Sequence, residues 1–209
     1  VLIYGGSGGV GSATARLLHA RGYTLHLVGR DQARLTTIAD ELNAGITVGD
    51  VLENELFTRA TQAAGPELSG LVYAVGTINV RSLTRLQETD FMLDYRINAL
   101  GAVLAIQAAL SSLKYAKDGA SVLLFSTIAV SQGFMGHASI GMAKGAVEGL
   151  TLSLAAELAQ ERYNLGLSSV VELSQAQLNR TTAEIRNTAA RYDYLMQRSV
   201  VDFQAGRLR

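Results

Sequence analysis

Lys144 is the residue of this sequence that packing explains least well. The apolar or small positions that recur around it at helical spacing are Ile140, Val147, Thr151, Leu154 and Leu158. The lysine therefore falls in the middle of a helical face that is expected to be buried. Because an unpaired ammonium is costly to bury, Lys144 is a candidate for a binding or catalytic site.

Other polar residues that could do chemistry lie near the ends of predicted elements. Ser126 and Thr127 follow an apolar run, and the sequence does not decide which hydroxyl would face a ligand. Asn98 lies inside a long helical segment, where it could belong to a site or satisfy backbone groups at a helix irregularity. His137 precedes Lys144 by seven residues, which is about 10 Å along a helix axis. Its imidazole could donate a proton near neutral pH, although a histidine at a loop–helix junction is more often structural.

The elements that must position these residues alternate regularly. Strands are predicted at 1–4, 24–28, 46–48, 71–75 and 121–125, and helices at 9–21, 31–42, 53–64, 88–115 and 139–162. This alternation predicts an α/β fold, a doubly wound parallel sheet of the Rossmann type, in a single domain over 1–209. Another apolar run follows at 165–171, and 174–197 has a polar, helical pattern.

A glycine-rich turn follows the first predicted strand and opens the first helix. The segment contains Gly5, Ser7, Gly9, Val10 and Gly11. Glycines at such a turn let the backbone approach a pyrophosphate, which then lies at the positive helix N-terminus. The strand–turn–helix context therefore predicts a dinucleotide site.

Several ordered motifs resemble those of the short-chain dehydrogenase/reductase family. Besides the spacing of the three glycines, they are Asp50-Val51, Ala74-Val75-Gly76, Asn98, Ser126-Thr127 and Lys144. The resemblance is clear over about 1–165 and weak after 172. It implies that the glycine-rich turn, Asp50-Val51, Ala74-Val75-Gly76 and Lys144 contact the cofactor. It also implies that Asn98, Lys144 and one of the two hydroxyls serve catalysis. Tyr73 and Ala74 stand where the family motif has asparagines.

The end of the second predicted strand predicts the choice of cofactor. NAD-specific sites place a carboxylate there, whereas this chain has Gly29 followed by Arg30. A guanidinium can hold a 2′-phosphate by charge-assisted hydrogen bonds, so NADP(H) is the predicted cofactor. The alternative is an exposed Arg30 that pairs with Asp31.

The family resemblance also shows that the usual proton donor is missing. The family motif is Tyr-x-x-x-Lys on one helix, in which the tyrosine transfers the proton. Here Ile140 stands four residues before Lys144, and isoleucine has no transferable proton. His137 is the candidate substitute acid. The chain is thus expected to be a divergent member of the family.

Composition excludes several other classes. Hydrophobic residues make up 48% of the chain, eighteen basic residues balance eighteen acidic ones, and there is no cysteine. A nucleic-acid or membrane partner, a disulfide and a metal site are therefore not expected. No signal peptide is predicted, the apolar stretch 99–109 is too short for a membrane span, and we expect a cytoplasmic protein. The opening of the sequence inside an apolar strand suggests that a few residues precede Val1.

Three functions remain open from the sequence. The leading one is an NADP(H)-dependent oxidoreductase of a small carbonyl or alcohol, which by resemblance forms a homodimer or homotetramer. The second is a catalytically silent NADP(H)-binding sensor or scaffold, which Ile140 favours. The third is an enoyl-type reductase, in which hydride addition to a conjugated double bond needs less help from the usual tyrosine.

Overall fold

A computed structural model describes residues 1–117 and 119–164. Its strands are β1 (Leu2–Tyr4), β2 (His26–Gly29), β3 (Gly45–Val48), β4 (Gly70–Tyr73) and β5 (Ser121–Leu124). Its helices are α1 (Gly9–His19), α2 (Gln32–Leu42), α3 (Glu55–Ala64), α4 (Glu88–Tyr95), α5 (Gly101–Lys114), α6 (Ala129–Gln132) and α7 (Ala138–Asn164). Two further helical segments are η1 (Leu83–Arg85) and the π-helix η2 (Arg96–Leu100).

The five strands form one parallel sheet in the order β3-β2-β1-β4-β5. Ile3 of β1 pairs with Leu27 of β2 on one side and with Val72 of β4 on the other. The chain therefore moves outward in one direction from β1 to β3 and then returns to the far side of β1. At such a reversal the loops after neighbouring strands diverge, which opens a crevice at the carboxyl ends of the strands. The predicted doubly wound fold is confirmed.

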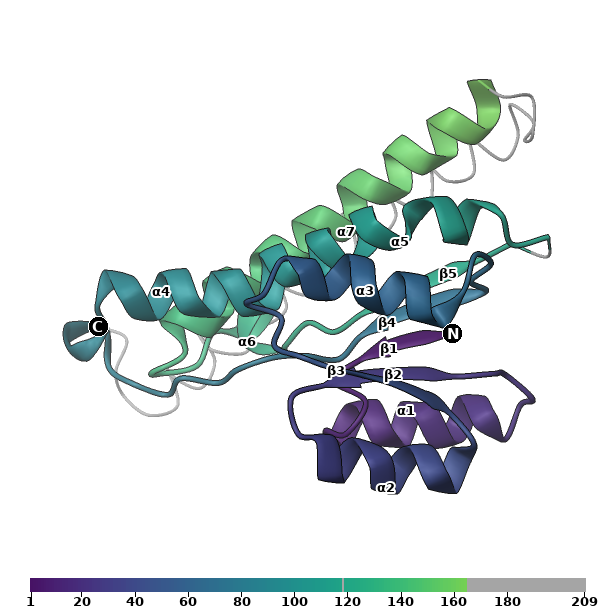
Figure 1. The fold of residues 1–209 in the computed structure, drawn as a ribbon. Helices are drawn as coiled ribbons and strands as arrows, with labels where there is room; N and C mark the ends of the chain where they lie inside the picture. The colour runs from purple at the N-terminus through teal and green to yellow at the C-terminus, as the bar shows by residue number, and fades with distance from the viewer. Residues whose placement is uncertain (118, 165–209) are drawn as a thin grey trace, which may run out of the picture.

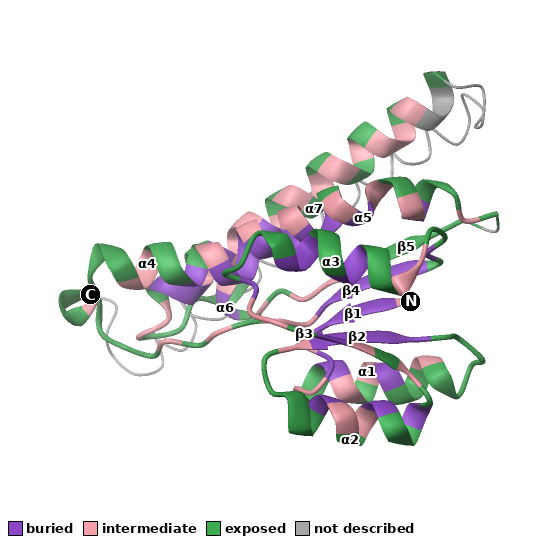
Figure 2. Cartoon of the chain, in the orientation of Figure 1, coloured by how far each residue is buried: buried purple, intermediate pink, exposed green. Residues whose placement is uncertain are grey.

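Helices cover both faces of the sheet (Figure 1). On one side α1 and α2 pack over Ile3, Leu27 and Val72, whereas Leu2 and Tyr4 belong to the core on the side of α3 and α5. Alternate residues of a strand point to opposite faces, and both faces of the central strands are buried (Figure 2). This explains why the strand sequences are continuous apolar runs.

The predicted helix 88–115 is continuous but changes form in its middle. The π-turn η2 separates α4 from α5, and a π-turn leaves helix carbonyls without their usual partners. The buried Tyr73 hydroxyl donates a 2.7 Å hydrogen bond to the Ile97 carbonyl, and the Asn98 side chain donates to the Asp94 carbonyl at 2.9 Å. The irregularity is thus supported by side chains from β4 and from the turn itself.

The same helix meets the length and composition of a membrane span. The continuous segment Glu88–Lys114 contains an 18-residue window of mean hydropathy 1.4, and 56% of that window is buried within the protein. Because α5 packs against β4 and α3, the apolar character of this segment is explained by core packing. The apolar stretch 99–109, which we expected to be too short for a membrane span, belongs to this packed part of the helix.

Two short elements were not predicted, namely η1 and α6. Most other predicted boundaries differ from the observed ones by a few residues, as expected where helix and strand ends fray. The apolar run 165–171 and the helical pattern 174–197 lie outside the described residues.

Candidate functional site

A cleft of about 250 Å³ lies at the carboxyl ends of the strands. The segments that follow β1, β2, β3 and β4 all contribute to its wall, which includes Gly5, Ser7, Arg30, Asp50, Val51, Ala74, Val75, Gly76 and Thr77. Eight of these nine were predicted as cofactor residues from the sequence; Thr77 was not. Because the cleft lies where β1 and β4 diverge, its place is the one at which doubly wound folds bind ligands.

The glycine-rich turn brings the start of α1 to this cleft. Gly5 has a positive φ of 79°, which a residue with a side chain rarely adopts. A Cβ at Gly11 would clash with the Gly5 carbonyl, so this close approach also requires glycine. Gly9 and Val10 begin α1, and no side chain in the described part of the chain caps this helix start. Its backbone N–H groups are therefore available for an anion such as a pyrophosphate.

Two arginines stand at the end of the cleft formed by β2 and α2. The Arg30 guanidinium contacts the Asp50 carboxylate at 3.3 Å, so the alternative pairing with Asp31 is wrong. Asp31 instead caps α2 by accepting a hydrogen bond from the Arg34 backbone N–H at 3.1 Å. The Arg34 side chain reaches back to the Ser7 carbonyl at 3.0 Å. Sequence reasoning missed Arg34, although its place in the first turn of the predicted helix, close in sequence to Arg30, was a usable signal.

Lys144 lies beyond β4 and is partly buried. Its Nζ donates to the Phe125 carbonyl at 2.9 Å, and burial lowers the pKa of the ammonium. The structure places Nζ 3.6 Å, and Asn98 Oδ1 3.0 Å, from the position that a Gly76 Cβ would occupy. Strand β4, the π-turn and α7 therefore bring Gly76, Asn98 and Lys144 together. An ammonium has three N–H donors, and within the described residues Lys144 uses one of them.

Asn98 is almost completely buried, with 1% of its surface exposed. Its Nδ2 donates to the Thr77 hydroxyl at 2.8 Å and to the Asp94 carbonyl at 2.9 Å. Its Oδ1 accepts from the Thr77 backbone N–H at 3.4 Å. The asparagine thus satisfies backbone groups at the π-turn, as one interpretation proposed, and it also faces Gly76 and Lys144.

The two candidate hydroxyls after β5 differ in their surroundings. Ser126 Oγ donates a short hydrogen bond of 2.5 Å to the Glu148 carboxylate and is exposed. Thr127 Oγ1 accepts from the Ala129 backbone N–H at 3.3 Å. A hydroxyl has one hydrogen to donate. The Ser126 hydrogen is already used, whereas the Thr127 hydrogen has no acceptor among the described residues.

The remaining two candidates, Ile140 and His137, take part in none of these hydrogen bonds. Ile140 is 4% exposed and lies on the buried face of α7 with Ala143 and Val147. His137 accompanies Phe134 in the lining of a different hollow of about 250 Å³. Its Nδ1 is 2.9 Å from the Met135 carbonyl, and since a carbonyl only accepts, Nδ1 must carry a hydrogen. Neither Lys144 nor Asn98 is among the described residues that line the hollow beside His137.

Comparison with known proteins identifies the family. The model of the short chain dehydrogenase family matches residues 1–170, so this chain belongs to that family, whose members are oxidoreductases. The 3-oxoacyl-[acyl-carrier-protein] reductase of Rattus norvegicus is 29% identical over 174 residues, which cover 79% of this chain and 71% of the relative. Carbonyl reductase family member 4 of Danio rerio is 28% identical over 172 residues, with 79% and 72% covered.

Solved structures agree with this assignment. A short chain dehydrogenase/reductase family protein is similar with a TM-score of 0.70 and 27% identity, covering 75% of this chain and 66% of that one. The present chain therefore spans just under two thirds of that protein. An oxidoreductase of E. coli is similar with a TM-score of 0.70 and 25% identity, covering 77% and 70%.

Proposed function

We propose that this protein is an NADP(H)-dependent oxidoreductase that acts on a small carbonyl or alcohol. The observation that carries the proposal is the meeting of Lys144 Nζ and Asn98 Oδ1 around Gly76, beside a cleft at the reversal of the strand order. Relatives named as a 3-oxoacyl reductase and a carbonyl reductase support carbonyl chemistry. The residues around the cleft fit a dinucleotide, since the uncapped start of α1 and the bare backbone of the glycine turn suit a pyrophosphate.

Lys144 and Thr127 then have distinct roles. Bound NADPH would supply the hydride. Within the described residues Lys144 has N–H groups to spare and would hold ribose hydroxyls. The Thr127 hydroxyl hydrogen, which has no acceptor among the same residues, would be donated to the substrate oxygen. Ser126 is the weaker choice for that role because Glu148 holds its hydrogen.

Preference for NADP(H) over NAD(H) is supported by charge at the end of β2. A Cβ at Gly29 would lie 3.2 Å from Ser7 Oγ and 3.4 Å from Leu35, so a carboxylate side chain fits poorly there. The Arg30 side chain is 76% exposed and, among residues 1–117 and 119–164, forms an ion pair with Asp50 alone, which a 2′-phosphate could replace at little cost. Arg34 lies in the first turn of α2 and lines the same cleft.

The test is titration calorimetry with both cofactors. NADPH should bind more tightly than NADH, and Arg30→Ala should weaken NADPH by about 1.5–3 kcal/mol, as expected for charge-assisted hydrogen bonds. The loss should be smaller for NADH, which lacks the phosphate. Equal affinity of the unmodified protein for both cofactors would contradict the preference. Turnover of a carbonyl panel with NADPH tests the activity itself.

A catalytically silent NADP(H) sensor is the second candidate. The buried Ile140 favours it, because the position one turn before Lys144 is filled by apolar packing and supplies no proton. A sensor would bind NADPH as tightly as the enzyme does but would turn over no carbonyl. The two candidates are therefore separated by activity and share the same prediction for binding.

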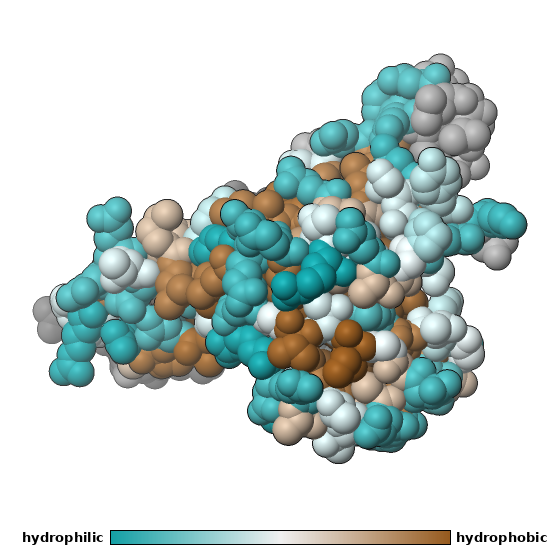
Figure 3. Space-filling view, viewed as in Figure 1, coloured by the Kyte–Doolittle hydropathy of each residue, from teal (hydrophilic) through white to brown (hydrophobic). Residues whose placement is uncertain are grey.

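Self-association is also proposed. Apolar residues gather along the long helices on the face shown in Figure 3. Met92 and Leu93 of α4 and Met142 of α7 are exposed by 58%, 48% and 49%. Helices that are apolar on more than one side are usually buried on more than one side, which supports a homodimer or homotetramer.

A further inference from the structure

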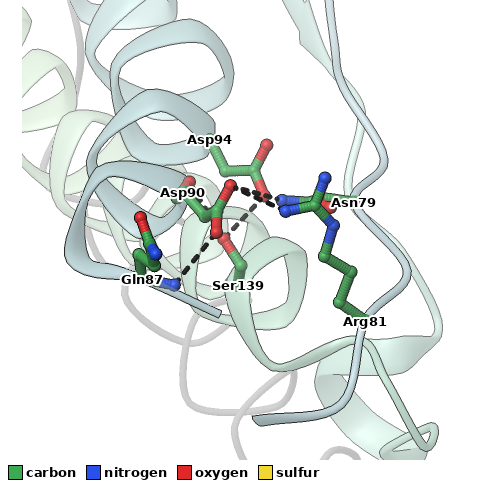
Figure 4. Close-up of polar contacts among 6 residues, drawn as sticks. All are labelled: Asn79, Arg81, Gln87, Asp90, Asp94 and Ser139. Carbon is green, nitrogen blue, oxygen red and sulfur yellow. Dashed lines mark hydrogen bonds and ion pairs between the residues drawn. The ribbon is translucent and has the colours of Figure 1, made fainter. Parts of the chain in front are cut away.

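Asp94 is a buried carboxylate that the proposed reaction has not used. It lies on α4 with 3% of its surface exposed, and no basic side chain forms an ion pair with it in the described part of the chain. Instead, the Ser139 hydroxyl donates to Asp94 Oδ2 at 2.6 Å (Figure 4). The Thr77 hydroxyl donates to Asp94 Oδ1 at 2.5 Å. Burial of a carboxylate is costly unless hydrogen bonds satisfy it, so the two hydroxyls explain how this one is accommodated.

A neighbouring carboxylate fixes the same loop between β4 and α4. One turn earlier on α4, Asp90 accepts from Asn79 at 3.1 Å and from the Gln87 backbone N–H at 3.0 Å, and its carboxylate lies 3.6 Å from Arg81 (Figure 4). The Gln87 N–H, more than the other contacts, lowers the pKa of Asp90. The backbone that carries Thr77 is therefore held on both sides, by the strand before it and by these contacts after it.

The direction of the hydrogen bonds around Thr77 follows from simple counting. An ionised carboxylate only accepts, and a threonine hydroxyl has one hydrogen and two lone pairs. The hydrogen of Thr77 goes to Asp94, so one lone pair must receive the hydrogen that Asn98 Nδ2 donates at 2.8 Å. One lone pair remains. Thr77 is only partly buried and lines the cleft beside Gly76.

We propose that Thr77 is a further ligand-binding residue, which Asp94 orients so that its hydroxyl oxygen accepts a hydrogen bond from a hydroxyl group of the molecule in the cleft. Asp94 is a positioning residue, since it is buried and acts through Thr77. The group of the ligand that Thr77 recognises is an alcohol O–H. Because Thr77 adjoins Gly76, Asn98 and Lys144, this O–H belongs to the nicotinamide half of the dinucleotide. This inference rests on the proposed function.

The experiment compares two ligands in calorimetry. NADPH carries both halves of the dinucleotide, whereas adenosine 2′,5′-bisphosphate carries the adenosine half alone. Thr77→Val keeps the shape of the side chain and removes the hydroxyl, so NADPH affinity should fall about three- to tenfold, the range of one hydrogen bond. Affinity for the bisphosphate should stay unchanged. Thr77→Ser restores the hydroxyl and should restore NADPH affinity.

Two further variants test whether Asp94 orients the Thr77 hydroxyl or only supports the fold around it. Asp94→Leu keeps the approximate size of the side chain but accepts no hydrogen bond, so the Thr77 hydroxyl loses its fixed direction and NADPH affinity should fall. Ser139→Ala removes the other hydroxyl from the same carboxylate and should leave NADPH affinity within about twofold, because Thr77 is untouched. If Thr77→Val does not fold, Asp94→Leu carries the comparison.

The outcomes are distinct. Loss of NADPH affinity in Thr77→Val and Asp94→Leu, with bisphosphate affinity kept and Thr77→Ser rescued, supports the inference. Unchanged NADPH affinity in Asp94→Leu or Thr77→Val overturns it, as does an equal loss for both ligands. An unmodified protein that binds neither ligand would instead contradict the proposed function.

Discussion

Replacement of Ile140 by tyrosine tests whether the proton donor is the only part that the proposed reductase site lacks. Position 140 lies one helical turn before Lys144, so the two side chains share a face of α7. Lys144 and Asn98 already lie around Gly76, and the Thr127 hydroxyl hydrogen has no acceptor within the described ranges. A phenol at 140 would add a general acid to this arrangement. We therefore expect Ile140→Tyr to create or raise carbonyl reductase activity.

The expected magnitude has two opposing parts. General acid catalysis is worth about 10²–10⁴-fold in rate, which is about 3–5.5 kcal/mol of transition-state stabilisation. Against this, Ile140 is 4% exposed and its neighbours Ala143 and Val147 are 0% and 2% exposed. A larger ring in so closely packed a place should cost about 1–3 kcal/mol of folding stability. A gain in rate is therefore expected only while the variant remains folded.

The matched control is Ile140→Phe, which adds the same ring without the phenol. Oxidation of NADPH is followed at saturating cofactor for both variants, and thermal unfolding is measured alongside. The ratio of the two rates isolates the proton donor from the change in packing. If both variants fold and bind NADPH, and tyrosine gives no more activity than phenylalanine across a broad carbonyl panel, the reasoning is wrong. The sensor function would then be the better proposal.

Other expectations can be checked separately. Arg34→Ala should weaken NADPH several-fold more than NADH in calorimetry if its guanidinium assists Arg30 at the 2′-phosphate; equal losses would show a structural role. Tyr73→Phe should lower the free energy of unfolding by about 1–3 kcal/mol in denaturant titration, because a buried carbonyl of the π-turn loses its donor. Burial lowers the pKa of His26 below its unfolded value, so its contribution to stability is present above about pH 6.5 and is lost as the pH falls; His26→Gln should flatten that part of the pH–stability curve. His137→Ala should leave NADPH affinity unchanged, and if the unmodified protein is active, a loss of turnover would identify the histidine as the acid. Sedimentation should show a dimer or tetramer at micromolar concentration, and a monomer would contradict the proposed self-association.

Local patterns were sufficient to predict the fold and to bring together many of the residues that line the cleft at the carboxyl ends of the strands. The glycine-rich turn depends on backbone freedom within a few residues, and parallel strands bring the segments after them to one edge of the sheet. Gly5, Asp50 and Gly76, which are distant in sequence, could therefore be assigned to one cleft that the structure shows. The sequence also indicated that Lys144 is a candidate site residue, because a charged residue within an apolar helical face can be recognised from local spacing.

Partners chosen by tertiary packing were not predictable in this way. Arg30 pairs with Asp50, twenty residues away, because parallel pairing places the ends of β2 and β3 side by side while Asp31 is occupied as a helix cap. Asp94 forms hydrogen bonds with Thr77, 17 residues before it, and with Ser139, 45 residues after it. No sequence pattern around Thr77 or Ser139 indicates that its hydroxyl pairs with a carboxylate so far along the chain. Only the packing of α4 against α7 and the loop after β4 decides which polar groups share a buried space, and each buried polar group must then find its partner there.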